Sequence, residues 1–290
     1  KSSALNLGIE MVDSEIIVCL DADTIFAKDT ISRLVPHFVD PKVGAVAGNV
    51  KVGNRTNPLT IWQSVEYITS QNFDRRAYAA LNSVSVVPGA VGAWRRSAVI
   101  EAHGYSSDTL AEDTDLTFRV RTLGYHIQTE NEALAFTEAP DTVSALAKQR
   151  FRWAFGTLQS LWKHRKVLFN RKYGAFGMFV MPATWIFNIF LQAFGPIVDI
   201  AVIMSLFNGE YAAVLTYYAA FFVLDFFGSA LAVRLDKEDP KQLAWLFWQR
   251  FFYRQFMYYV ILKSIMAALK GGIVGWGKLH RKATVALTEE

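Results

Sequence analysis

The chain of 290 residues contains a single cysteine, Cys19, and no internal repeat or low-complexity tract. One cysteine excludes an internal disulfide and a cluster of thiolate metal ligands, and it suits a reducing compartment. The sequence also begins without an initiator methionine or a targeting signal. We therefore expect it to be a fragment of a longer protein.

Hydrophobic residues make up 52% of the chain and aromatic residues 14%, which is high for a purely soluble enzyme. They are concentrated toward the carboxyl-terminal part, which predicts a soluble half joined to a membrane half. A basic cluster precedes the first long apolar stretch, and such clusters usually mark the cytoplasmic side of a membrane. Its members are Lys163, Arg165, Lys166, Arg171 and Lys172.

The first 139 residues alternate short apolar runs with amphipathic stretches, a pattern typical of α/β folds. The expected elements are strands at 16–20 and 43–52, helices at 29–38 and 59–81, and a run at 84–87 that leads into a glycine-containing loop. In the helix at 59–81 we expect Arg75 and Arg76 to be exposed.

An acidic pair, Asp21 and Asp23, follows the apolar run 14–20 directly. Ligands of open α/β sheets bind at the carboxyl ends of the strands. Two carboxylates so close together repel each other unless a cation lies between them, and a divalent ion carrying a diphosphate fits that place. The alternative is a solvated aspartate turn.

A second acidic cluster, Glu112-Asp113-Thr114-Asp115, stands at the start of a helix predicted to end at Gly124. Helix N-termini favour carboxylates, so capping explains one or two of these acids but not readily three. A transferase that joins a sugar to a hydroxyl in a single displacement needs a general base and a metal ion that stabilises the departing diphosphate. Asp113 and Asp23 can divide these tasks.

A third group lies on a helix expected at 142–166, with Asp141 as its cap. Gln149, Arg152 and Trp153 fall at i, i+3 and i+4 on one face. A guanidinium beside an indole offers a phosphate clamp and a flat surface for a sugar ring, or simply a cation–π contact. One side of the helix is apolar and the other basic, so it can lie along a membrane or dock on the soluble part.

The stretch 176–207 has 32 residues and would measure about 48 Å as one helix, whereas a bilayer core of about 30 Å needs only about 20 residues. We expect Pro182, Gly195 and Pro196 to split it, giving a hairpin or an interfacial piece followed by one span. Residues 211–233 form a clearer span.

Residues 243–269 are apolar but contain Arg250, Arg254 and Lys263, so this segment can cross the membrane or line a polar passage. Asp199 and Asp225 either face such a passage or form structural ion pairs with these cations. The closing stretch is basic, which favours a cytoplasmic end and an even number of crossings. Its cations are Lys278, Arg281 and Lys282.

With these motifs in this order, nearly the whole chain resembles the family 2 glycosyltransferases, and in particular their processive membrane branch, which makes chitin, cellulose, hyaluronan and poly-N-acetylglucosamine. The resemblance implies a glycosyltransferase-A-type α/β nucleotide-sugar domain whose amino-terminal part is missing here, followed by an all-α membrane region. The implied units are a partial catalytic domain (1–140), an interfacial helix (141–172) and a transmembrane region with a cytoplasmic tail (173–290).

The resemblance also implies roles on the donor side. Lys1 to Asn6 is similar to the family's Lys-x-x-Ala-Leu-Asn segment, in which Lys1 and Asn6 would contribute to the nucleotide site. Asp21 and Asp23 match the Asp-x-Asp motif, in which the second acid binds the metal ion, Mg²⁺ or Mn²⁺, and the first lies near the nucleoside.

On the acceptor side, residues 88–95 are similar to a glycine-rich loop that contains Gly89, Gly92 and Arg95. Asp113 falls at the place of the catalytic base, after Glu112. Many members have a threonine before these acids where this chain has Ala111, so the roles of the two acids are open to exchange.

The Gln-x-x-Arg-Trp signature is matched by Gln149, Arg152 and Trp153. It implies contact with the diphosphate and stacking under the acceptor sugar. We expect Arg150 and Arg152 to offset the charge of the departing diphosphate.

The sequence therefore predicts an inverting, metal-dependent enzyme that transfers a sugar from a UDP-sugar to a growing polysaccharide and couples synthesis to export. Among the sugars, N-acetylglucosamine is the one we expect. The expected location is the plasma membrane, with several crossings and a cytoplasmic catalytic domain. Expected partners are the donor, the polysaccharide, the bilayer and polysaccharide-modifying or export proteins, with no nucleic acid. The alternatives are transfer of a single sugar to a lipid carrier and a catalytically degenerate transport or scaffold protein.

Overall fold

The structure, a computed structural model, describes residues 1–271 and contains a five-stranded mixed sheet with the order β1-β4-β3-β5-β2. β3 and β5 are parallel, and the other neighbouring pairs are antiparallel. The predicted α/β class of the amino-terminal part is confirmed. The strands are β1 (Ile16–Cys19), β2 (Thr24–Phe26), β3 (Val43–Val52), β4 (Gly92–Arg95) and β5 (His126–Thr137).

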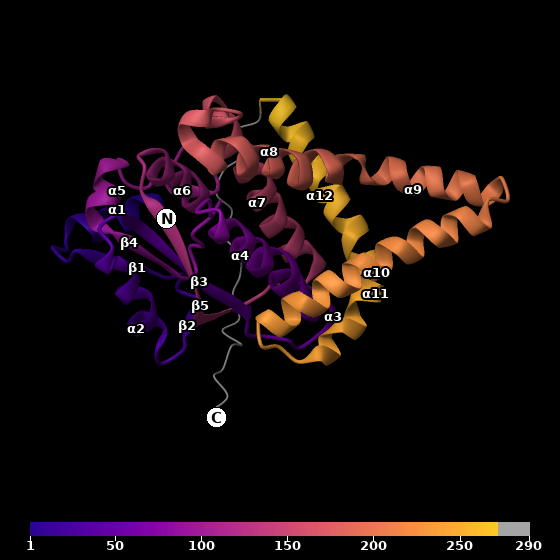
Figure 1. The fold of residues 1–290 in the computed structure, drawn as a ribbon, viewed down its shortest axis with the longest axis horizontal. Coiled ribbons are helices and arrows are strands. Elements are labelled where there is room, and N and C mark those ends of the chain that lie inside the picture. Colours follow the sequence, from indigo (N-terminus) through magenta and orange to yellow (C-terminus); the bar gives the residue numbers. More distant parts are fainter. Residues whose placement is uncertain (272–290) are drawn as a thin grey trace.

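Helices cover the sheet on both faces, which is why all ten residues of β3 are buried. One face packs on α1, α5 and α6, and the other packs on α2 and the 3₁₀ turn that follows it (Figure 1). Ala45 and Ala47 of β3 belong to the first core and Val46 to the second, as the two-residue period of a strand requires. These helices are α1 (Ser2–Glu10), α2 (Thr30–Leu34), α5 (Arg96–Glu101) and α6 (Glu112–Thr122).

The pairing of β1 with β4 sets the position of two loops. Cys19 lies opposite Gly92 and Ile16 opposite Arg95, so β4 begins where β1 ends. The loops 20–23 and 88–91 therefore leave the sheet at the same edge. Gly92 and Arg95 belong to the strand itself, so the expectation that the glycine-containing loop extends to Arg95 is wrong.

A long helix connects the sheet with the helical part of the molecule. It consists of α3 (Pro58–Glu66), a π-helical segment (Tyr67–Asn72) and α4 (Phe73–Ala80), and it starts with a capping box between Asn57 and Thr60. The predicted exposure of its two arginines is wrong. Arg75 is 7% exposed and donates to the carbonyl of Gly48 at 3.2 Å, and Arg76 is bound to Asp236 at 2.9 Å.

The helix expected at 142–166 is α7 (Val143–Lys163), followed by a 3₁₀ turn (Arg165–Val167). Its cap is Thr142, whose hydroxyl accepts from the amide of Ala145 at 3.3 Å, and not Asp141. Side chains of α7 and α6 share one apolar core, and α7 also packs on α12.

The stretch Phe176–Phe207 is helical throughout, so the predicted split at Pro182, Gly195 and Pro196 is wrong. Pro182 lies between two π-helical segments, whose altered hydrogen bonding accommodates the N–H that proline lacks, and Pro196 lies inside the helix that ends at Phe207. The pieces are a π-helical segment (Phe176–Val180), α8 (Met181–Ala183), a second π-helical segment (Thr184–Phe190) and α9 (Leu191–Phe207).

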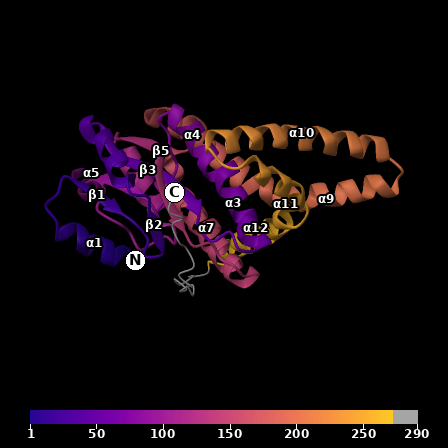
Figure 2. The ribbon, with the colours of Figure 1, turned by 90° about the horizontal axis from the view of Figure 1, so that it is seen from below.

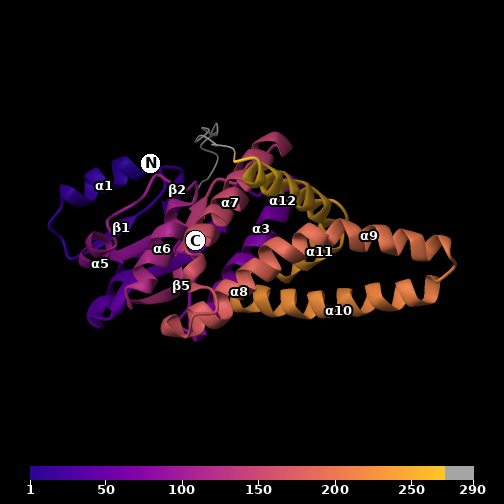
Figure 3. The same ribbon diagram turned by 90° about the horizontal axis from the view of Figure 1, so that it is seen from above.

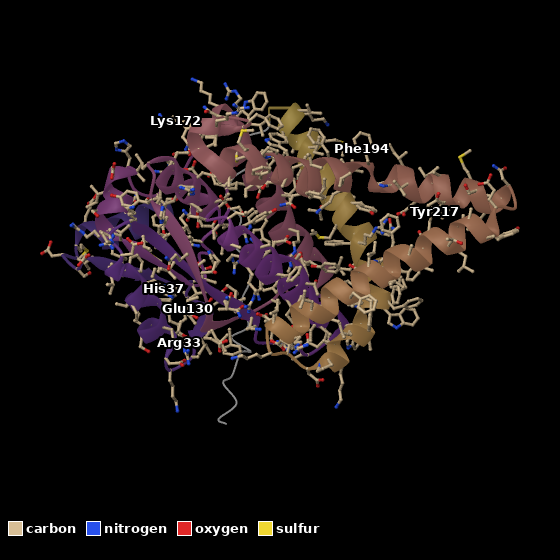
Figure 4. The ribbon with its side chains drawn as sticks, in the orientation of Figure 1. Arg33, His37, Glu130, Lys172, Phe194 and Tyr217 are labelled. Carbon is tan, nitrogen blue, oxygen red and sulfur yellow. The ribbon has the colours of Figure 1, made fainter. Side chains whose placement is uncertain are left out.

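After a short turn, α10 (Tyr211–Leu235) returns beside α9, and the two arms extend together away from the sheet (Figure 2 and Figure 3). Both stretches are long and apolar enough to cross a membrane, with mean hydropathy of 2.0 and 1.6. Only 11% and 6% of their most apolar windows are buried, so they are not core helices of the α/β part. Phe194 and Tyr217 mark the two arms in Figure 4.

The remaining helices, α11 (Trp245–Phe251) and α12 (Tyr253–Leu269), return toward α7. Two of their arginines pair with acids of the arms: Arg254 lies 3.2 Å from Asp199, and Arg250 lies 2.7 Å from Asp225. The predicted basic end with Lys278, Arg281 and Lys282 lies outside the described residues.

Candidate active site

Lys1 joins the two acidic motifs. Its ammonium nitrogen lies 2.7 Å from Oδ1 of Asp21, at the end of β1, and 2.9 Å from Oε1 of Glu112, at the start of α6. The sequence predicts that the two acidic segments serve one site, and the structure brings them to one cation. Glu112 is 5% exposed, so the acid of this ion pair is shielded from bulk water, whereas Lys1 is in contact with solvent.

The loop before β4 completes the cluster. The amide of Gly89 donates to Oδ2 of Asp113 at 3.2 Å. A Cβ atom added at Gly89 would lie 2.7 Å from the Lys1 ammonium and 3.7 Å from carboxylate oxygens of both Asp113 and Asp21. A side chain at this position would therefore displace the Lys1 ammonium from its place between the two acids, whereas the two carboxylates would be in ordinary contact.

The charges in the cluster tune the proton affinity of Asp113. Burial, and then the neighbouring Glu112 carboxylate, raise the pKa of Asp113 to about 6, against the opposing effects of Lys1 and of the amides of Thr114 and Gly89. Burial lowers the pKa of the Lys1 ammonium, but Asp21, Glu112 and Asp113 together raise it above its ordinary value. Near neutral pH the lysine is therefore charged and Asp113 is mostly ionised, with a proton affinity suited to a general base.

The carboxylate oxygens at the end of β1 suit a hard divalent cation that a substrate phosphate also binds. Asp21 and Asp23 offer carboxylate oxygens two residues apart at the end of β1. Among residues 1–271 no group of three acids, histidines or cysteines is arranged to hold a metal ion by itself. Mg²⁺ is typically bound by one or two carboxylates together with substrate phosphates, and this arrangement matches that pattern.

Two predicted site residues have structural partners elsewhere. The side chain of Asn6 pairs with the backbone of Tyr105, accepting from its amide at 2.7 Å and donating to its carbonyl at 2.9 Å. Arg95 lies at the far end of β4 and donates to the carbonyls of Val43 and Phe38 at 2.9 and 2.7 Å. Neither side chain is part of the Lys1 cluster.

In the Gln-x-x-Arg-Trp helix, Gln149 and Arg150 are buried and Trp153 is exposed. Arg150 is 2% exposed, forms an ion pair with Glu66 and donates to Gln149 at 2.8 Å and to Tyr253 at 3.2 Å. These contacts direct Arg150 from α7 toward α3 and α12, and not toward the acids bound to Lys1. Trp153 is 38% exposed.

The guanidinium carbon of Arg150 lies 4.2 Å from the centre of the Trp153 ring. Arg150 therefore supports the indole through a cation–π contact. Arg152, one helical position before Trp153, is partly buried.

Thr117, which lies one turn after Asp113 on α6, is a further residue of the site that the sequence did not indicate. Its hydroxyl donates to the carbonyl of Asp113 at 2.7 Å and accepts from the amide of Val87 at 3.0 Å. It thereby ties the loop that contains Gly89 to the helix that contains Asp113. The i, i+4 spacing was the only available signal, and the long-range partner is not visible in the sequence.

The chain is similar to known proteins in sequence and in fold. The family model described as Glycosyl transferase family group 2 matches residues 16–227, which is more than half of the chain. The chain belongs to this glycosyltransferase family. The matched region contains both acidic motifs, the glycine loop and the Gln-x-x-Arg-Trp helix.

Two curated relatives of this glycosyltransferase are poly-β-1,6-N-acetyl-D-glucosamine synthases. That of Staphylococcus aureus (strain COL) is 33% identical over 157 residues, which cover 54% of this chain and 38% of the relative. That of Staphylococcus epidermidis is 26% identical over an alignment 296 residues long, gaps included, which covers 97% of this chain and 71% of the relative.

Among solved structures, a mannosyltransferase from Pyrobaculum calidifontis, in complex with GDP-Man and Mn²⁺, matches with a TM-score of 0.58. It is 19% identical, and the match covers 93% of this chain and 66% of that chain. At this identity the match establishes the shared fold, a glycosyltransferase-type α/β domain with a mixed sheet.

Proposed function

We propose that the protein transfers N-acetylglucosamine from a UDP-sugar to the end of a growing polysaccharide, with inversion at the anomeric carbon and export of the product across the plasma membrane. The observation that carries this proposal is the bridge from Asp21 through Lys1 to Glu112, because it brings the donor-side and acceptor-side motifs into one site. The similarity to two poly-β-1,6-N-acetyl-D-glucosamine synthases supports the choice of sugar and polymer.

In this proposal Asp113 accepts the proton of the acceptor hydroxyl. The hydroxyl oxygen forms a bond to the anomeric carbon, and the bond from that carbon to the diphosphate breaks, so that UDP leaves with the electron pair. A single displacement of this kind inverts the configuration. The position of Asp113 beside Gly89 and Glu112 supports this role, because burial and Glu112 give it the pKa of about 6.

Asp23, with Asp21 beside it, would hold Mg²⁺ or Mn²⁺ together with the diphosphate. When bound, such an ion supplies positive charge that stabilises the departing UDP. Lys1 keeps Asp21 and Glu112 in place from the protein side. The exposed indole of Trp153 would stack on the acceptor sugar, and the guanidinium of Arg150 stabilises that indole through the cation–π contact.

The proposal assigns residues 1–140 to catalysis, 141–172 to the boundary with the membrane and 173–290 to the membrane region, with a cytoplasmic catalytic domain. The exposed apolar arms Phe176–Phe207 and Tyr211–Leu235 support insertion into the bilayer. Pairing of Asp199 with Arg254 and of Asp225 with Arg250 lowers the cost of placing these charges near lipid.

The test is to incubate membranes that contain the full-length protein with a panel of UDP-sugars and to measure UDP release and product length. We expect long products from UDP-N-acetylglucosamine. Asp113→Asn should reduce the rate about 10²- to 10⁴-fold with unchanged donor binding. Asp13→Asn, at an exposed position before β1, is the matched control.

Products of one added sugar on a lipid would contradict the polymerising function, and a normal rate for Asp113→Asn would contradict the base assignment. If no UDP-sugar were turned over by the full-length protein, the proposed activity would be excluded.

A further inference from the structure

The helix α7 touches the backbone in front of the acidic helix α6. Gly156 of α7 is buried against Ala111 and Leu110, the two residues that precede Glu112. A Cβ atom at Gly156 would lie 2.5 Å from the amide nitrogen of Ala111 and 2.8 Å from the carbonyl carbon of Leu110. These are backbone atoms, so no rotamer change could relieve the contact.

The next turns of α7 extend this contact with polar groups. Oε1 of Gln159 accepts from the amide of Leu110 at 2.9 Å. The ammonium of Lys163 lies 2.9 Å from carboxylate oxygens of both Asp108 and Asp115. Gly156, Gln159 and Lys163 are spaced by three and four residues and therefore share one face of α7. This face holds the segment 108–115 at both of its ends.

Glu112 and Asp113 lie in the middle of that segment. We propose that Gly156 and Gln159 are positioning residues for Asp113, an inference that rests on the proposed function. A general base must lie within hydrogen-bond reach of the proton it accepts, and a displacement of about 1 Å can reduce the rate about 10²-fold. Close backbone contact at Gly156 and the hydrogen bond from Gln159 restrict such a displacement.

The same helix carries Trp153, one turn before Gly156. Because α7 is a single uninterrupted helix of 21 residues, it fixes the separation between the indole offered to the acceptor and the segment that contains Asp113. A larger residue at position 156 would push the two apart without touching Asp21 or Asp23. The inference therefore predicts a defect in the chemical step and not in donor binding.

The experiment compares Gly156→Ala, Gln159→Leu and Gln159→Glu in the full-length membrane protein. We expect kcat to fall about 10²-fold for Gly156→Ala and by at least tenfold for Gln159→Leu, with the KM for the UDP-sugar within about twofold of the parent value. Gln159→Glu keeps an acceptor for the Leu110 amide and should recover most of the rate. Gly8→Ala is the matched control, because an added Cβ at this helical glycine meets nothing within 4 Å.

A parent-like kcat in Gly156→Ala and Gln159→Leu would overturn the inference, as would equal loss in the Leu and Glu variants at position 159. If Gly156→Ala does not fold, the comparison of Gln159→Leu with Gln159→Glu tests the inference.

Hydrogen exchange of the peptide that contains Leu110 tests the contact without turnover. Faster exchange in Gln159→Leu than in the parent supports the inference, and equal exchange contradicts it. If the parent enzyme turned over no UDP-sugar, the proposed function would fail, whereas this exchange measurement would still decide on the contact.

Discussion

The ammonium of Lys1 lies 2.9 Å from the carboxylate of Glu112, and this contact joins the start of the chain to the start of α6. The same nitrogen binds Asp21 at the end of β1. One cation therefore neutralises acids from two segments that would otherwise repel each other. The charge of Lys1 also lowers the pKa of Asp113.

The transfer rate should depend on the ionisation of Asp113. Burial and Glu112 raise the pKa of Asp113 to about 6, and a general base works only when deprotonated. We therefore expect kcat/KM to fall with decreasing pH, with a midpoint near 6. Lys1 lowers this pKa, so Lys1→Met, which removes the charge, should move the midpoint to higher pH.

The measurement is the pH profile of kcat/KM for the parent and for Lys1→Met. Lys28→Met is the control, because Lys28 is an exposed cation that does not act on Asp113. A midpoint that stays in place after removal of the Lys1 charge would show that Asp113 is not the group that titrates.

We predict that Asp115 stabilises the folded protein. It is fully buried and bound by Arg119 and Lys163 at 2.9 Å and by His164 at 2.8 Å. Breaking a buried pair of this kind typically costs about 3–5 kcal/mol, because the remaining cations lose their partner. We expect Asp115→Asn to lower the thermal midpoint in detergent strongly. Asp29→Asn, whose ion pair with Arg33 is solvent-exposed, should leave the thermal midpoint almost unchanged.

The sign of the pH effect follows from the ionisation of Asp115. Burial alone would raise its pKa, but hydrogen bonds from His164 and Lys163 and the charge of Arg119 lower the pKa of Asp115 to about 2. Because the value in the unfolded chain is about 3.9, this contribution to stability is complete above about pH 4 and is lost as the pH falls toward 2. Equal acid sensitivity of the parent and Asp115→Asn would contradict this assignment.

Asp236 is predicted to join the arm α10 to the sheet. Its side chain is 1% exposed and lies 2.6 Å from the ammonium of Lys51 on β3 and 2.9 Å from the guanidinium of Arg76 on α4. Asp236→Asn should therefore destabilise the protein by about 3–5 kcal/mol. Lys237→Ala removes the neighbouring exposed pair with Glu132 and should have little effect. Similar melting of the two variants in detergent would refute a structural role for Asp236.

Metal removal tests the role of Asp23. We expect a chelator to abolish transfer and added Mn²⁺ or Mg²⁺ to restore it. Loss of even an outer-shell partner of a metal typically reduces affinity about 10- to 100-fold, so Asp23→Asn should raise the half-saturating metal concentration at least as much. Full activity in the presence of chelator would exclude the metal-dependent proposal.

Patterns local in sequence were predictable from sequence. The apolar run before Asp21, the acidic start of α6 and the long apolar arm α10 each depend on neighbours within one element, and the structure contains all three. The resemblance to family 2 glycosyltransferases depended on the same local motifs, and the family match confirms it.

Long-range partners were not predictable. Arg75 follows the pattern of an exposed helical residue, yet the carbonyl of Gly48 on β3 holds it inside. The side chains of Arg95 and Arg150 bind backbone carbonyls and Glu66, partners that no local pattern indicates. Likewise, Pro182 does not break the stretch, because π-helical segments on both sides of it accommodate the missing N–H.

The antiparallel pairing of Cys19 with Gly92 has a consequence for engineering. The segments 20–23 and 88–91 begin from adjacent points on one rigid edge, although about seventy positions separate them along the chain. We expect that either can be exchanged for a segment from another family 2 glycosyltransferase while the strand pairs behind it hold their alignment. Under the proposed function, such grafts at the rim would change the residues that face the substrates, with the buried scaffold left as it is.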